Sequence, residues 1–180
     1  MSSATIRLDD LAAGMPGITP RIGAVFAEAA VLCFEEHSHS SGVPMPVDGD
    51  LVREISVAWS ALADPEQAKR AWADRQVTTE HGACCVAALL IAQLMDLVVV
   101  ERSRKGTGFD YWLGKSAGDA QLFQKRARLE VSGIAKGTEP LLMARIRQKV
   151  NQTKVSDGVR LPAVIAVVEF GEPRSRLKRR

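Results

Sequence analysis

The sequence predicts one α/β domain, with a mixed central sheet and helices on both of its faces. The first observation is a helical pattern over residues 78–94, where apolar side chains recur every three or four positions. The second is a series of short runs with the composition of strands, at 97–101, 109–113 and 127–134. The third is another helical pattern, over 138–153, followed by an apolar strand at 161–170. A three-stranded meander and a helical crossover to a fourth strand give such a sheet.

Capping residues support both helices of this second half. Thr78 is expected to cap the first helix, which would place Glu80 in its first turn. Thr138 is expected to cap the second, where Glu139 suits the positive end of the helix dipole. On that second helix, Arg145, Lys149 and Gln152 share one polar stripe, opposite an apolar one.

The first half of the chain predicts mainly helices. Residues 1–19 are expected to form an irregular arm, because glycine and proline recur there. Helices are expected at 21–36, at 50–62 and after the cap Asp64, with a loop over 37–50. The predicted organisation is an N-terminal helical extension (1–76) that packs on the core (77–170), followed by a basic, flexible tail (171–180).

Length and composition fit one domain of ordinary size. The chain has 180 residues, of which 46% are hydrophobic, enough for a packed core. No stretch approaches the roughly 20 consecutive apolar residues of a membrane-spanning helix, and the N-terminus lacks the pattern of a secretion signal. We therefore expect a cytoplasmic protein with no membrane partner.

Charge is distributed unevenly along the chain. Residues 1–100 hold 6 basic and 13 acidic residues, a net charge of −7, whereas residues 101–160 hold 13 basic and 6 acidic residues, a net charge of +7. A basic second half suggests an anionic partner, with nucleic acid as the leading candidate. The alternatives are that the acidic half packs on the basic one, or that the excess charge is a solvated surface.

Two acidic residues fall inside predicted strands. Asp110 lies in the run Gly-Phe-Asp-Tyr-Trp-Leu-Gly, and Glu130 in the run Ala-Arg-Leu-Glu-Val-Ser-Gly. A charge between apolar neighbours is costly unless it is paired, hydrated or bound to a metal. If the strands are neighbours, alternation can place both carboxylates on one face. Two such carboxylates form a hard oxygen site suited to Mg²⁺ or Mn²⁺.

Gly-x-Asp on one strand followed by Glu-x-Ser on the next resembles the signature of the PD-(D/E)XK, or restriction-endonuclease-like, nuclease superfamily. The helix–strand–strand–strand–helix–strand order of residues 77–170 is also similar to that family's αβββαβ core. The resemblance implies that Asp110 and Glu130 are metal ligands and that Glu80 is the acidic residue many members carry on the preceding helix. It implies a metal-dependent nuclease that hydrolyses nucleic-acid phosphodiester bonds, with a role in restriction or defence against foreign DNA.

One position departs from that family's signature. The motif lysine is expected at position 132, where this chain has Ser132. Members of the family supply the lysine from elsewhere, often from the following helix, so that Lys149 or Lys125 would take its place. The departure favours the alternative of a catalytically inactive nuclease-fold subunit that binds DNA or a protein partner. A third hypothesis is a protein–protein module whose acidic first half binds a basic partner.

Each candidate residue also has a structural interpretation. Asp110 and Glu130 could instead form ion pairs with arginines, and Glu80 could stabilise the start of its helix. The arginines in question are Arg104, Arg126 and Arg128.

Basic residues near the two carboxylates are candidates for phosphate contacts. They are Arg102, Arg104, Lys105, Lys125 and Arg145. The expected partner is nucleic acid, DNA before RNA, and a homo-oligomer or larger complex remains open.

Overall fold

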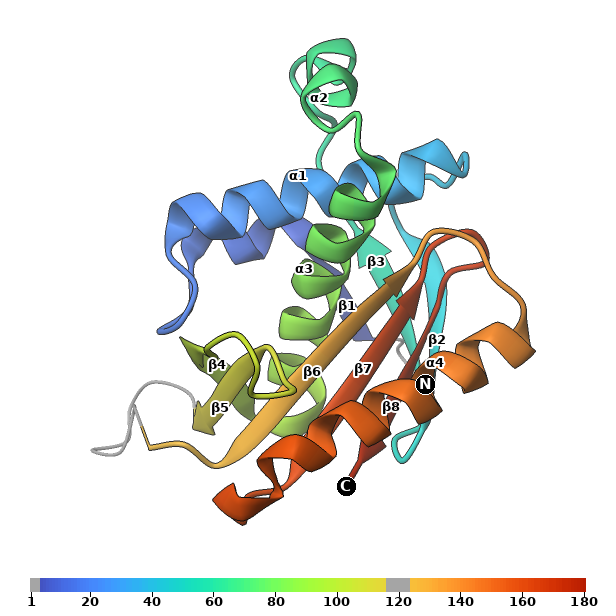
Figure 1. Cartoon of the computed structure of the whole chain (residues 1–180). Helices are drawn as coiled ribbons and strands as arrows, with labels where there is room; N and C mark the ends of the chain where they lie inside the picture. Colours follow the sequence, from blue (N-terminus) through green and yellow to red (C-terminus); the bar gives the residue numbers. More distant parts are fainter. Residues whose placement is uncertain (1–3, 116–123) are drawn as a thin grey trace.

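The computed structural model describes residues 4–115 and 124–180, and its described strands form one eight-stranded mixed sheet (Figure 1). The strand order is β1-β3-β2-β8-β7-β6-β5-β4. The strands are β1 (Ala4–Arg7), β2 (Val43–Gly49), β3 (Arg53–Ala58), β4 (Leu97–Arg102), β5 (Tyr111–Lys115), β6 (Ala127–Ile134), β7 (Ala163–Glu169) and β8 (Arg174–Arg179). The helices are η1 (Leu8–Ala13), α1 (Pro20–Glu36), α2 (Pro65–Ala71), α3 (Arg75–Met95), α4 (Glu139–Thr153) and η2 (Lys154–Val159). The predicted α/β class is confirmed.

The second half has the predicted order α3-β4-β5-β6-α4-β7. β4, β5 and β6 pair antiparallel as a meander, and β7 lies parallel to β6 after the crossover through α4. The two faces of β7 contact different helices. Val164 and Ala166 belong to the main core with α3, whereas Ile165 belongs to a smaller core with Leu142 and Ile146 of α4. Helices therefore cover opposite faces of this part of the sheet.

The prediction of a helix over 50–62 is wrong, because β3 occupies that segment and pairs antiparallel with β2. Ile55, Val57 and Trp59 are all buried. This period of two matches the pleat of a strand and overrides the helical spacing that the same segment also shows. The first half therefore adds three strands to the sheet as well as helices.

The two ends of the chain are ordered as well. The segment expected to be an irregular arm contains β1, which pairs with β3, and then η1. The tail expected to be flexible is β8, which lies between β7 and β2 and joins the two halves of the sheet. Leu177 is buried in the main core, and Arg176 forms ion pairs with Asp48 and Glu139. Alternation of buried and paired residues explains how so basic a segment occupies the interior of a sheet.

Two of three predicted boundaries near the site differ in the structure. Asp74, not Thr78, caps α3 and accepts hydrogen bonds from two backbone N–H groups, so Glu80 lies beyond the first turn. Thr138 does take the position before α4, although its side chain makes no capping bond. β5 begins at Tyr111, which leaves Asp110 just before the strand rather than inside it.

α3 is the helix at the centre of the main core. Its length and apolar composition would suffice to cross a membrane, so the expectation that no stretch approaches such a span was too strict. However, 56% of the apolar window is buried inside the fold, which is the situation of a core helix.

Candidate functional site

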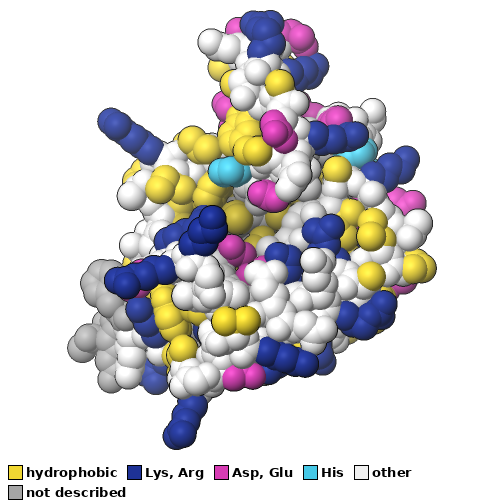
Figure 2. All heavy atoms as spheres, viewed as in Figure 1, with side chains coloured by type: hydrophobic (Ala, Val, Ile, Leu, Met, Phe, Trp, Pro, Cys, Tyr) yellow, Lys and Arg dark blue, Asp and Glu magenta, His cyan; other side chains and the backbone are white. Residues whose placement is uncertain are grey.

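A cavity lies beside the part of β6 that extends beyond its neighbour β5. β5 pairs with β6 only as far as Leu129, so the rest of that edge of β6 has no described strand beside it. A cavity of about 620 Å³ lies along this free edge, between α3 and α4. Figure 2 shows acidic and basic side chains gathered around a hollow near the centre of this face. Strand register and the two flanking helices thus position the candidate site.

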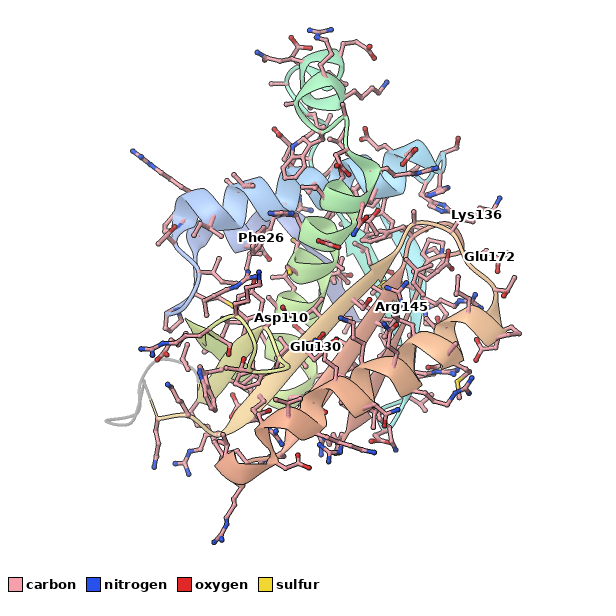
Figure 3. All side chains as sticks on the ribbon, in the orientation of Figure 1. Phe26, Asp110, Glu130, Lys136, Arg145 and Glu172 are labelled. Atoms are coloured by element: carbon pink, nitrogen blue, oxygen red, sulfur yellow. The ribbon has the colours of Figure 1, made fainter. Side chains whose placement is uncertain are left out.

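Asp110 lies at the point where the two strands separate. Its backbone N–H donates to the carbonyl of Leu129 (2.8 Å), and its carboxylate accepts the N–H of Val131 (2.8 Å). The side chain therefore takes the hydrogen bond that a continuing β5 would have accepted. Although Asp110 is not mid-strand as predicted, these two bonds direct its carboxylate toward β6 (Figure 3).

Glu130 is buried on the face of β6 that α4 covers, with 1% of the residue exposed. Its Oε1 accepts hydrogen bonds from Lys149 Nζ (2.6 Å) and Gln152 Nε2 (2.9 Å). Its Oε2 is buried and has no hydrogen-bond partner. A buried carboxylate oxygen without a partner is costly, and this one marks a place for a proton or a cation.

The pKa of Glu130 is raised to about 7. Burial is the main cause, and the charge of Asp110 adds to it, while the hydrogen bond and charge of Lys149 act in the opposite direction. A hydrogen bond between the two carboxyl groups, which can form only once one of them is protonated, raises this pKa further. The two carboxyl groups are therefore close enough to act as one site.

Of the two lysines considered for the motif role, Lys149 is at the site and Lys125 is not. Lys149 lies on α4 and forms an ion pair with Glu130 of β6. Its ammonium also donates a hydrogen bond to Gln152 (3.2 Å), which lies one turn further along the same helix. Lys125 pairs with Glu101 (3.0 Å), and its ammonium lies 4.4 Å from the ring centroid of Trp112. The structure thus brings a lysine to Glu130 from the helix that follows β6.

Ser132 stands two residues beyond Glu130 on the same face, where the signature has its lysine. It is buried, and its hydroxyl accepts a hydrogen bond from Arg145 Nη1 (2.8 Å). Arg145 makes no carboxylate ion pair within residues 4–115 and 124–180, and it lines the cavity. Ser132 therefore holds a cationic side chain from α4 toward the cavity (Figure 3).

The opposite wall of the cavity comes from α3. Gly133 allows the close approach of β6 to this helix, because a Cβ there would lie 2.4 Å from the carbonyl oxygen of Thr79. Glu80 lines the cavity and accepts a hydrogen bond from Gln76 (3.0 Å). Since it lies outside the first turn of α3, the helix-dipole interpretation of Glu80 loses its basis.

Of the predicted arginine partners, neither Arg104 nor Arg128 pairs with the two carboxylates. Arg128 is buried on the same face as Glu130, but it donates to the carbonyls of Leu161 and Thr153 and to Ser156. Among the described ion pairs, none joins Arg104 to Asp110 or Glu130. Lys149 is the cation that pairs with Glu130.

The other basic candidates fall into two groups. Arg102 lines the cavity, donates to the hydroxyl of Tyr111 (2.8 Å) and lies over its ring. Arg104 and Lys105 are exposed in the turn between β4 and β5 and do not line the cavity. Arg102 and Arg145 are thus the predicted phosphate contacts that the structure brings to the carboxylates.

The donor set fits a hard divalent cation at Asp110 and Glu130. Two adjacent carboxylates and one orphaned oxygen offer the ligands that Mg²⁺ and Mn²⁺ prefer, and Mg²⁺ commonly keeps several waters beside one or two protein carboxylates. In the part of the chain that the structure describes, no three His, Cys, Asp or Glu side chains gather in the arrangement of a metal centre. A cation held here would therefore depend on water for its remaining ligands.

Sequence reasoning placed the two carboxylates and Lys149 but missed other parts of the cavity. Gln152 lies on the polar stripe predicted for α4, but its hydrogen bond to Glu130 was not predicted. Phe26 and His81 also line the cavity, and no local pattern could have brought α1 to this place. In comparisons with known proteins, no family model, no curated protein and no solved structure matches the chain.

Proposed function

We propose that this protein is a metal-dependent nuclease of the PD-(D/E)XK type that hydrolyses phosphodiester bonds in DNA. The observation that carries the proposal is the pair Asp110 and Glu130 at the free edge of β6, with an orphaned carboxylate oxygen beside Lys149. The strand and helix order of residues 77–170 and the resemblance of the two motifs support it. A cytoplasmic role in restriction or defence is the setting that this class suggests.

In this proposal each residue has a defined task. Asp110 and Glu130 would hold Mg²⁺ or Mn²⁺, which when bound supplies a water of lowered pKa and offsets charge on the phosphate. Lys149, held by Glu130 and Gln152, orients the attacking water and adds positive charge. Arg145 and Arg102 flank the carboxylates from α4 and β4 and bind phosphate oxygens on either side.

The test combines cleavage with a binding measurement that does not depend on activity. Plasmid and single-stranded DNA are incubated with the protein in Mg²⁺, in Mn²⁺ and in chelator, beside Asp110→Asn, Glu130→Gln and the control Glu101→Gln. We expect metal-dependent cutting that both site variants lose and the control retains. We also expect Mn²⁺ to raise the melting temperature of the wild type and the control but not of the site variants. Cutting that survives in both site variants would refute this assignment.

Two specific observations favour a second function. Glu130 Oε1 already accepts two hydrogen bonds, and Ser132 occupies the position of the motif lysine. These contacts suit a non-catalytic subunit that keeps the fold and binds DNA through its basic residues. Well-folded protein that binds DNA with a steep salt dependence, yet neither cuts it nor responds to Mn²⁺, would establish this alternative.

A further inference from the structure

A second, apolar groove continues from the candidate site. It has a volume of about 420 Å³ and shares Phe26, His81 and Arg102 with the larger cavity. We call it the apolar groove, and its other main residues are Ile18, Ile22 and Val25. Its wall comes from the N-terminal half of α1, which lies across the top of the carboxylate cavity in Figure 3.

The apolar groove is open to solvent although its lining is hydrophobic. Ile22 is 46% exposed and Val25 is 45% exposed. Single exposed apolar residues are ordinary on a protein surface, but these two line a concavity beside a charged cavity. Figure 2 shows hydrophobic side chains gathered over this end of α1, next to the hollow.

Arg102 stands at the junction of the two cavities. It is held against the Tyr111 ring, with its Cζ 4.9 Å from the ring centroid. Among the ion pairs of residues 4–115 and 124–180 it has no carboxylate partner. Arg21 also lines the groove. The junction therefore offers positive charge to a phosphate, with an apolar surface directly beyond it.

Charge followed by an apolar, aromatic-edged groove matches the chemistry of an unpaired nucleotide. In a duplex the bases face one another, so the walls of a cleft contact mainly phosphate and sugar. An unpaired strand can place its phosphates on cationic side chains and its bases on apolar or aromatic ones. In the apolar groove, Phe26 and His81 already pack edge to face, with ring centroids 5.4 Å apart.

We propose that the substrate is an unpaired DNA strand, whose phosphate lies between Arg102 and the carboxylates and whose neighbouring base enters the apolar groove. This specificity rests on the proposed function for the identity of the site, because it places the strand across the same carboxylates. It requires that base contact with Ile22 and Val25 contribute to binding.

The test measures binding in chelator, where a nuclease would not cut. Labelled oligonucleotides of one sequence are compared as a single strand, as a duplex, and as a single strand with abasic sites that keep every phosphate. We expect the wild type to bind the intact strand at least about fivefold more tightly than the abasic strand or the duplex, because only the intact single strand offers unpaired bases to the groove. The double variant Ile22→Ser, Val25→Ser should bind intact and abasic strands alike. Val52→Ser, which changes another exposed valine outside the groove, should behave as the wild type.

The outcomes separate this proposal from the proposed function. Metal-dependent cutting combined with equal binding of intact and abasic strands would overturn the base-binding groove and leave the nuclease standing. Base-dependent binding without any cutting would support the groove and overturn the nuclease. Tighter binding of the duplex, or no binding to any of the three oligonucleotides, would overturn the groove proposal. Melting curves of the double variant check that a loss of binding is not a loss of fold.

Discussion

Two buried charges stand two residues apart on the same face of β6, and they are satisfied very differently. Arg128 is 3% exposed and Glu130 is 1% exposed. Arg128 directs its guanidinium to carbonyl oxygens of Leu161 and Thr153 and to the hydroxyl of Ser156, with Asp157 3.6 Å away. Glu130 has Lys149 and Gln152 on one oxygen and nothing on the other.

This difference indicates that Arg128 stabilises the fold, whereas Glu130 has the properties of a functional residue. Arg128 fixes η2 and the start of β7 against β6, because its partners come from the segment that joins α4 to that strand. Glu130 faces a cavity, has an orphaned oxygen and carries a raised pKa. Such perturbed groups in clefts concentrate at functional sites.

The largest expected effect is on stability and comes from the satisfied charge. Arg128→Ala removes the guanidinium bonds to the Leu161 and Thr153 carbonyls and to the Ser156 hydroxyl, so we expect the free energy of unfolding to fall by about 3–5 kcal/mol. Urea denaturation followed by circular dichroism measures this loss. Arg104→Ala, which alters an exposed arginine, is the control. A loss below about 1 kcal/mol for Arg128→Ala would mean that this cluster does not hold the fold.

The comparison also shows where sequence patterns suffice. The order of the second half was predictable because its helices and strands carry distinct hydrophobic periods, as in the apolar run of β7 and the alternation in β6. β3 was not, because Ile55, Ala58 and Leu62 also fit a helical period. β8 was missed because a basic segment at the end of the chain is typical of a solvated tail. The acidic partners of its side chains, Asp48 and Asp50, lie far away in the sequence.

The candidate site also contains residues that the sequence predicts and features that it does not. Asp110 and Glu130 were predictable as charges among apolar neighbours, and α4 offered Lys149 on its polar stripe. The choice between Lys149 and Lys125 required the crossover geometry, because both lysines are near the motif in sequence. The separation of β5 from β6 depends on pairing that ends at Leu129, and that ending leaves no local mark in the sequence.

The next largest expected effect is on the cleavage rate, and it tests the role of Lys149. If the chain is a nuclease, Lys149→Ala should lower the cleavage rate about 100-fold, a magnitude typical of a positioned proton-transfer or charge-stabilising group. Lys125→Ala is the matched control, because it removes a lysine that pairs with Glu101 outside the cavity. Single-turnover cleavage rates are the measurement. Equal rates for the two variants would contradict a catalytic role for Lys149, and a larger loss in Lys125→Ala would reverse the assignment.

The smallest effect tests the orphaned oxygen of Glu130 through pH, in the absence of metal. The pKa of Glu130 in the fold is about 7, above its ordinary value of 4.5. Between these values the folded protein keeps a proton that the unfolded chain has released, so Glu130 lowers stability as pH rises through this window. Glu130→Gln removes that loss, and one pKa unit is worth about 1.4 kcal/mol.

The Glu130→Gln variant should therefore become more stable relative to the wild type as pH rises. We expect the difference in melting temperature, Glu130→Gln minus wild type, to increase by about 5–10 °C from pH 5 to pH 8 in chelator. Glu101→Gln, at an exposed ion pair, should show no such increase. A difference that stays constant with pH would mean that Glu130 is ionised throughout and that Lys149 fully compensates it, which would make the pair structural like Arg128. An increase in the difference would show that the ionised form of Glu130 destabilises the fold in the absence of metal. This is expected of a carboxylate that binds a cation.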